Sequence, residues 1–203
     1  MNIFCIEQNY FTHKRETPDK VVDEPVIFVK PQNALLLPGA AFFYPPLANE
    51  LYCGCELVLR ISKSGKNIEE KDAGDYYDAI TTGLNFIALF ESRELSEESL
   101  TWEKAKAWKN SSVEGHWFPV ANFNNKKDIN FCLYKNRALV QLGNSGLMVH
   151  NFNAIISFIS RSFSINDGDL IFTGTPAGIG KALPGDKLEA FVEDDSVLEF
   201  DID

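Results

Sequence analysis

Apolar and polar residues alternate most clearly between residues 51 and 61. Leucine, cysteine and isoleucine side chains fall at every second position there and share one face of an extended chain. They are Leu51, Cys53, Cys55, Leu57, Leu59 and Ile61. The other face carries Tyr52, Gly54, Glu56 and Arg60. This spacing predicts a β-strand with one buried face.

Other runs rich in β-branched and aromatic residues predict further strands in both halves of the chain. They lie at residues 2–6, 25–30, 83–90, 129–134, 137–142, 169–172, 187–193 and 197–202. Lys135-Asn136 separates the runs at 129–134 and 137–142. A short polar break of this kind predicts a β-hairpin.

Helical patterns are few and short. Asn151 is a good capping residue, and apolar side chains follow it at helical spacing. They are Phe152, Ile155, Ile156, Ile159 and Phe163. Residues 69–80 begin with acidic side chains and predict a short helix, and residues 102–108 are helical or irregular. The pattern indicates a β-rich α+β fold with a few short helices.

Length and charge narrow the class of protein. With 203 residues, 45% of them hydrophobic, we expect a single domain over residues 1–203. The formal net charge of −10 repels nucleic acid and anionic membranes, so neither is an expected partner. No apolar run is long enough for a membrane helix, and the first residues do not read as a secretory signal. The 4 cysteines show no evident pairing, so we expect a cytoplasmic protein.

The stretch FTGTPAGIGK at residues 172–181 follows an apolar run and combines glycines, threonines and a proline. Such a loop can bring backbone N–H groups close to an anion. A phosphate loop of the Walker type needs a hydroxyl residue directly after its lysine, but Ala182 follows Lys181. A nucleotide is therefore disfavoured, while a bound carboxylate and a simple tight turn both remain open.

The longer stretch GDLIFTGTPAGIG at residues 168–180 resembles the signature of the fumarylacetoacetate hydrolase family. CIEQNYFTHKRE at residues 5–16, EPVIFVKPQNALL at residues 24–36 and the pattern from Trp102 to Lys106 also resemble this family. The resemblance implies a mixed β-roll built around residues 51–61, 83–90 and 169–173, and a homodimer. It also implies that Gly174, Thr175 and Pro176 bind a substrate carboxylate or carbonyl.

Enzymes of this family act on small acids with 1,3-related oxo groups. The resemblance therefore implies metal-assisted hydrolysis, isomerisation or decarboxylation of an acylpyruvate-like acid. His13 and Glu16 match the family's catalytic pair that prepares water, and Lys106 matches a substrate-binding lysine. If their segment is helical, His13 and Glu16 share one face, where the carboxylate can orient the imidazole.

The metal ligands depart from the family pattern. Glu56 matches one ligand, whereas Gly54 replaces a second glutamate and Asn85 replaces an aspartate. Further differences from the family pattern are Gln8, Leu89 and Phe90. Because affinity for Mg²⁺ or Mn²⁺ depends on ligand charge, we expect Glu56 and Asn85 to hold either ion weakly.

Cys53 and Cys55 have a spacing that suggests zinc. The strand pattern instead places both on the apolar face, opposite Glu56, so we interpret them as core residues. Two hypotheses of function remain. One is a working oxo-acid enzyme, and the other is a family member that keeps a carboxylate-binding pocket but has lost metal binding and catalysis.

Overall fold

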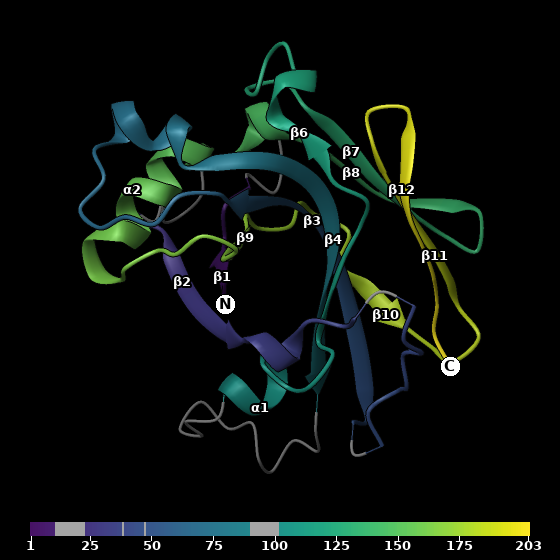
Figure 1. Ribbon diagram of the computed structural model, residues 1–203. Coiled ribbons are helices and arrows are strands. Elements are labelled where there is room, and N and C mark those ends of the chain that lie inside the picture. The colour runs from purple at the N-terminus through teal and green to yellow at the C-terminus, as the bar shows by residue number, and fades with distance from the viewer. Residues whose placement is uncertain (11–22, 38, 47, 90–101) are drawn as a thin grey trace.

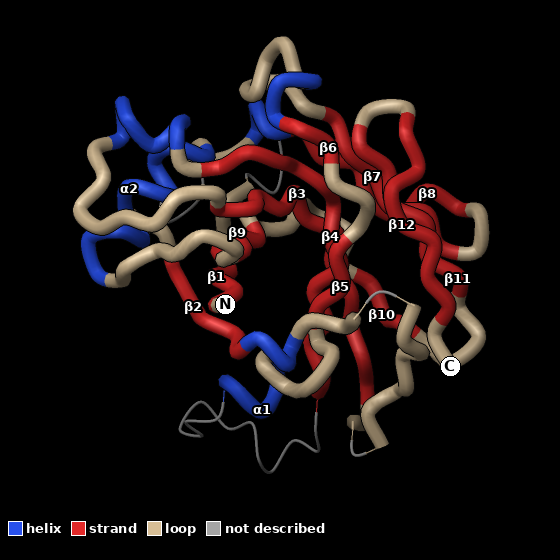
Figure 2. The backbone as a smooth tube through the Cα atoms, in the orientation of Figure 1, coloured by secondary structure: helices blue, strands red, loops and turns tan. Residues whose placement is uncertain are grey.

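Two β-sheets are the main secondary structure in the part of the chain that the computed structural model describes, namely residues 1–10, 23–37, 39–46, 48–89 and 102–203 (Figure 1). Strands far outnumber helices along the backbone (Figure 2). The prediction of a β-rich α+β fold is therefore confirmed.

The larger sheet has 8 strands among the described residues. Its main order is β2 (Val26–Pro31), β1 (Asn2–Glu7), β9 (Leu170–Phe172), β3 (Glu50–Ile61), β4 (Tyr77–Leu89) and β5 (Ser112–Glu114). β10 (Gly180–Ala182) also pairs with β3, and β6 (Phe118–Pro119) pairs with β4. β1 and β9 are parallel, whereas the other pairs are antiparallel, so the sheet is mixed.

The smaller sheet contains β12 (Asp195–Asp201), β11 (Lys187–Val192), β7 (Asn130–Lys135) and β8 (Ala138–Asn144), in that order. The predicted hairpin is β7–β8, with its turn one residue later than expected. Asn136 and Arg137 have φ values of 52° and 68°. A two-residue turn with both φ angles positive matches the twist of the paired strands.

The described residues form two α-helices, α1 (Trp102–Lys106) and α2 (Phe152–Ser162). The Asn151 side chain accepts a hydrogen bond from the Ala154 N–H at 3.0 Å and caps α2 as predicted. Short 3-10 turns lie at Gln32–Ala34, Glu70–Asp75, Val120–Asn122 and Ser145–Leu147. No helix in the described ranges is both long enough and apolar enough to cross a membrane.

The helix predicted at residues 69–80 is largely wrong. Only a 3-10 turn forms, over Glu70–Asp75, and β4 already begins at Tyr77. Gly74 is a poor helix former, and aromatic and β-branched residues follow it, which favours an extended chain. The strand predicted at 83–90 is therefore the second half of a longer strand.

The prediction that β3 buries only one face is also wrong. Its cysteine and leucine face packs into the main core, where Phe131 and Leu133 of the smaller sheet also lie. On the opposite face, Gly54 and Glu56 are buried as well. The loop after β9 and a second apolar cluster around Cys5 and Phe172 cover that face. This second covered face carries the candidate site.

Candidate active site

A chain of hydrogen bonds joins three buried polar side chains of β2, β3 and β4 to the glycine loop. The Glu56 carboxylate accepts from Asn85 Nδ2 at 2.7 Å and from the Gly174 N–H at 2.7 Å. Asn85 Oδ1 in turn accepts from Lys30 Nζ at 2.8 Å. In the β3–β4 register Asn85 lies opposite Gly54, two residues from Glu56 on the same face of β3. This register brings the Asn85 amide next to the Glu56 carboxylate.

Lys30 is fully buried, with 0% of its surface exposed. Besides Asn85, its ammonium donates to the Ser111 carbonyl at 2.8 Å, to Ser111 Oγ at 3.1 Å and to Ser112 Oγ at 2.9 Å. Sequence reasoning did not select Lys30 as a site residue. The signal in the sequence was a lysine at the end of the apolar run VIFVK. It was missed because lysine side chains are usually exposed to solvent.

The loop after β9 needs glycine at its second position. Gly174 has a φ of +101°, and a Cβ atom there would lie 2.8 Å from the Asn9 Cβ. Asn9 holds the loop in place, since its amide donates to the Thr173 carbonyl at 2.8 Å and accepts from the His150 N–H at 2.8 Å. The Gly174 N–H is thereby directed at the Glu56 carboxylate.

A buried glutamine of β8 holds the next residues of the loop. Gln141 accepts from the Cys55 N–H at 2.8 Å and donates to Thr175 Oγ1 at 3.0 Å and to the Pro176 carbonyl at 3.1 Å. The Thr175 hydroxyl donates to the Cys55 carbonyl at 2.8 Å. Its hydrogen is therefore already engaged, whereas the Thr175 backbone N–H has no acceptor among the described residues.

Lys106 of α1 lies near Lys30, close enough for its charge to affect the Lys30 ammonium. Its ammonium pairs with Glu7, which follows Cys5 and Ile6 on β1, and lies 5.1 Å from the centre of the Phe28 ring. Burial is the largest cause of the raised pKa of Glu56 and of the lowered pKa of Lys30, while the Glu7 charge adds to the first shift and the Lys106 charge adds to the second. Lys106 thus belongs to the surroundings of Glu56 and Lys30, although its role in binding substrate stays a prediction.

Two predicted catalytic residues, His13 and Glu16, lie outside the described residues. The structure brings together Glu56, Asn85 and Gly174, and links Thr175 and Pro176 to them through the loop. Sequence reasoning missed Lys30, Asn9 and Gln141. Asparagine and glutamine are common surface residues, so only the contacts reveal the last two.

Burial moves the pKa values of Glu56 and Lys30 toward neutrality. Loss of hydration raises the pKa of Glu56 to about 7, even though hydrogen bonds from Asn85 and Gly174 act in the opposite direction. Burial likewise lowers the pKa of Lys30 to about 8. A carboxyl group that changes protonation near pH 7 is suited to proton transfer.

The raised pKa predicts a specific dependence of stability on pH. Glu56 binds its proton more tightly in the folded than in the unfolded chain. Its contribution to the free energy of unfolding is therefore complete below about pH 4.5 and is lost as the pH rises through about 7. We expect Glu56→Gln to remove about 2 kcal/mol of this decline between pH 5.5 and 7.5. Urea unfolding in EDTA measures it, and the exposed Asp194→Asn should keep the wild-type slope. Equal slopes for wild type and Glu56→Gln would contradict the raised pKa.

The described residues do not fit a divalent cation. They contain no cluster of three or more histidine, cysteine, aspartate or glutamate side chains able to hold a metal. Both Glu56 oxygens already accept N–H groups, and the Asn85 oxygen accepts from an ammonium. A Cβ atom at Gly54, where the family resemblance implies a glutamate, would lie 2.8 Å from Thr175 Oγ1. The space of the missing ligand is thus occupied.

Cys53 and Cys55 are core residues, as predicted. Cys53 and Cys55 are 4% and 0% exposed and belong to the main apolar cluster. Burial raises the pKa of both thiols, which disfavours the thiolate form that zinc requires. This observation argues against a zinc site at this pair.

Similarity to known proteins extends over almost the whole chain. The family model described as fumarylacetoacetate (FAA) hydrolase C-terminal matches residues 2–203. The mitochondrial oxaloacetate tautomerase FAHD1 of Mus musculus is 31% identical over 192 residues, which cover 95% of this chain and 87% of the mouse protein.

Solved structures show the same fold. The 2-hydroxyhepta-2,4-diene-1,7-dioate isomerase from Mycobacterium marinum aligns with a TM-score of 0.83 and 28% identity, covering 99% of this chain and 73% of the isomerase chain. The fumarylpyruvate hydrolase from Pseudomonas aeruginosa, solved with Mn²⁺ and pyruvate, aligns with a TM-score of 0.84, covering 100% and 90% of the two chains. Its 24% identity supports the fold alone.

Proposed function

This chain belongs to the fumarylacetoacetate hydrolase family, and we propose that it catalyses hydrolysis, isomerisation or decarboxylation of a small, acylpyruvate-like oxo-carboxylic acid. Relatives named as a tautomerase and an isomerase support this substrate class. The observation that carries the proposal is the glycine loop, whose Gly174 N–H already donates to a buried carboxylate.

In this proposal the substrate carboxylate binds between the loop and Lys106. The Thr175 N–H is the next donor along the loop after Gly174 and has no acceptor in the described part of the chain. Lys106 supplies positive charge from α1. A backbone N–H and an ammonium together favour a carboxylate over a neutral group.

The proposed chemistry is proton transfer next to the keto carbonyl of the substrate. Each of the three reaction types passes through an enol or enolate, so a base and a source of positive charge are both needed. We assign the base to His13, oriented by Glu16, as the family resemblance implies. Glu56, with a pKa of about 7, is a second group able to exchange a proton.

A divalent cation would stabilise an enolate as a Lewis acid. Because the described residues supply one carboxylate with both oxygens engaged, we expect Mg²⁺ and Mn²⁺ to bind weakly, and the proposed proton transfer does not use either ion. The cations that the described site provides are Lys30 and Lys106.

We further propose that the protein is cytoplasmic and forms a homodimer. Support for the dimer comes from β8, the edge strand of the smaller sheet, whose backbone groups on one side are not paired with another described strand. Leu139, Val140 and Leu142 of this strand are 51%, 37% and 67% exposed. An apolar edge strand of this kind invites pairing with a second chain.

Oxalate, a mimic of a small oxo-acid, tests the binding site. We expect Lys106→Met to weaken oxalate binding by about tenfold, because a charged hydrogen-bond partner is lost. Isothermal titration calorimetry measures the affinity, and Lys109→Met, an exposed lysine of the same region, should bind oxalate as the wild type does. Unchanged affinity in Lys106→Met would place the oxo-acid elsewhere.

A second candidate function is oxo-acid binding without turnover. The crowding of Gly54 by Thr175 favours it, because a family carboxylate cannot be restored there without moving the loop. Oxaloacetate tautomerisation and acylpyruvate hydrolysis, both followed by ultraviolet absorbance, separate the two functions. Oxalate binding with neither reaction above the uncatalysed rate would select the binding protein.

A further inference from the structure

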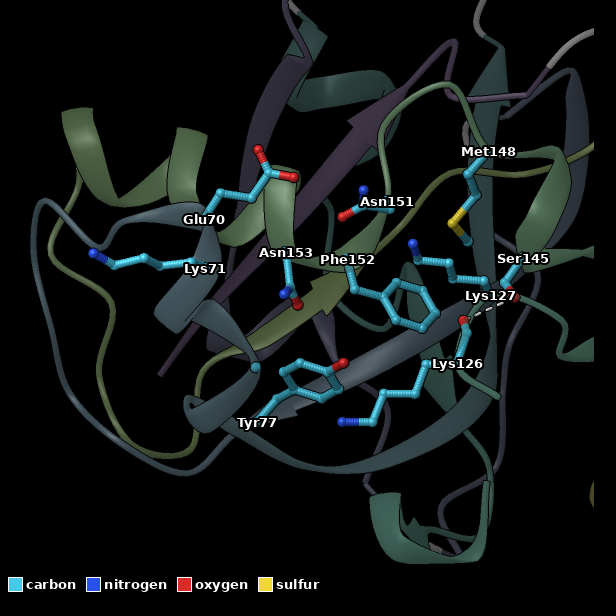
Figure 3. A pocket seen from close by; sticks show the side chains of 11 residues that line it. Glu70, Lys71, Tyr77, Lys126, Lys127, Ser145, Met148, Asn151, Phe152 and Asn153 are labelled. Carbon is cyan, nitrogen blue, oxygen red and sulfur yellow. Dashed lines mark hydrogen bonds between the residues drawn. The ribbon is translucent and has the colours of Figure 1, made fainter. Parts of the chain in front are cut away.

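A cavity of about 480 Å³ lies away from the candidate active site, between the start of α2, the beginning of β4 and the segment before β7. Figure 3 shows the side chains that line it. None of them belongs to the Lys30, Asn85 and Glu56 group. Tyr77 begins β4, eight residues before Asn85 on that strand.

Positive charge gathers on one side of this cavity. Lys126 and Lys127 both line it, and Lys126 Nζ lies 5.0 Å from the centre of the Tyr77 ring. Neither lysine has an ion pair within the described residues. Ser145 Oγ accepts from the Ile129 N–H at 2.9 Å and donates to the Lys126 carbonyl at 3.0 Å, which fixes the backbone of the lysine pair.

The other charged residues of the cavity do not cancel this charge. Lys71 is paired with Glu69 at 2.8 Å, and Glu70 is an acidic residue in the lining. Figure 3 shows Glu70 and Lys71 on the far side of the cavity, across Asn153 and Phe152 from the two lysines. An anion beside Lys126 and Lys127 is therefore separated from the Glu70 carboxylate.

A tyrosine hydroxyl opens into the same space without a protein partner. The Tyr77 side chain lines the cavity and is only 4% exposed, and its hydroxyl makes no hydrogen bond within the described ranges. Figure 3 shows this hydroxyl directed toward Phe152 and Lys126. Because this hydroxyl opens into the cavity and has no protein partner there, it can donate a hydrogen bond to a ligand atom.

The first turn of α2 adds backbone donors. Asn151 caps the N–H of Ala154, but the N–H groups of Phe152 and Asn153 come too early in the helix for an intrahelical acceptor. The positive end of the helix dipole and these N–H groups favour an anion. Phe152 and Met148, which also line the cavity, offer apolar contact to the rest of a ligand.

We propose that this cavity binds a small organic anion, a carboxylate or phosphate group joined to an apolar body, between Lys126, Lys127, the Tyr77 hydroxyl and the start of α2. The anionic group lies against the lysines and the helix N-terminus. The apolar body packs on Phe152 and Met148. This site is distinct from the oxo-acid site and does not depend on the proposed reaction.

Phenyl phosphate, benzoate and neutral benzyl alcohol test the proposal by calorimetry with oxalate present to occupy the candidate active site. We expect at least one of the two anions to bind, and to bind at least about tenfold more tightly than benzyl alcohol. The preferred anion identifies the group that the site recognises. Equal affinity for the alcohol and both anions, or binding of none of them, overturns the proposal.

Variants separate this cavity from other parts of the surface. Lys126→Met/Lys127→Met should weaken anion binding by about tenfold or more, and Tyr77→Phe by about threefold. Gly74→Met fills the cavity without removing a charge, because a Cβ atom at Gly74 has only the Asn153 amide nearby, at 3.9 Å. It should abolish binding, whereas Lys106→Met and Lys109→Met should leave it unchanged. Wild-type affinity in the double lysine variant, or a loss in Lys106→Met, overturns the assignment.

Discussion

Lys30→Met should lower the free energy of unfolding by about 3–5 kcal/mol at pH 7.5, the range typical for breaking a buried charge network. The ammonium donates to Asn85, to both the carbonyl and hydroxyl of Ser111, and to Ser112. A thioether cannot donate to any of them, and Glu56 loses a nearby positive charge. Urea unfolding monitored by circular dichroism measures the change.

Two further variants show whether charge or shape causes the loss. Ser112→Ala should cost about 1 kcal/mol or less, because the ammonium keeps acceptors at Asn85 and Ser111 for its N–H groups. Lys30→Met/Glu56→Gln should recover part of the stability lost in Lys30→Met, since the uncompensated carboxylate is also removed. A stability loss below 1 kcal/mol in Lys30→Met would contradict a structural role for the ammonium.

The strands of this fold could be predicted because their side chains alternate locally. β3, β7, β8, β9, β11 and β12 lie where the periodicity and turn residues indicate. β5, β6 and β10 were missed because they have two or three residues each and lack the continuous apolar run that marks β9, which is equally short. They are extended because the longer strands β3 and β4 offer them backbone hydrogen bonds. Their extended conformation therefore depends on distant residues rather than on their own sequence.

The candidate site was predictable only in part, for a similar reason. The family resemblance identified Glu56, Asn85 and the glycine loop, which the structure joins by hydrogen bonds. It did not identify Lys30 or Gln141, whose burial depends on residues distant in the chain. The alternation within β3 also could not show that Glu56 is buried. The loop that covers Glu56 follows β9, more than 100 residues later in the chain.

Of the two positions where the family pattern has an acidic ligand, Gly54 has no room for a side chain, whereas Asn85 already has one of the right shape. A glutamate at Gly54 would have to displace Thr175, whose Oγ1 would lie 2.8 Å from the new Cβ. That movement also disturbs the hydrogen bonds of Gln141. Asn85 is different, because aspartate has nearly the same shape. The single variant Asn85→Asp therefore tests the effect of ligand charge without moving the loop.

Asn85→Asp should raise the affinity for Mn²⁺ by about tenfold or more, because hard cations respond strongly to the number of charged oxygen ligands. The new carboxylate would face Glu56 across the present 2.7 Å contact, where it can no longer donate a hydrogen bond. Two carboxylates at this distance repel one another unless a proton or a cation lies between them. We therefore also expect the variant to be less stable than wild type in EDTA and to regain stability when Mn²⁺ is added.

Calorimetry with Mn²⁺ and thermal unfolding with and without the ion measure the two effects. Asn124→Asp, which adds the same charge at an exposed position, should change neither. Lys30 donates to this side chain, so its ammonium neutralises part of the charge that the new aspartate adds. Mg²⁺ should also bind to the variant, but with lower affinity than Mn²⁺. Equal Mn²⁺ affinity in wild type and Asn85→Asp would mean that charge at this position does not limit metal binding, and that the hydrogen-bonded group around Glu56 excludes the ion by itself.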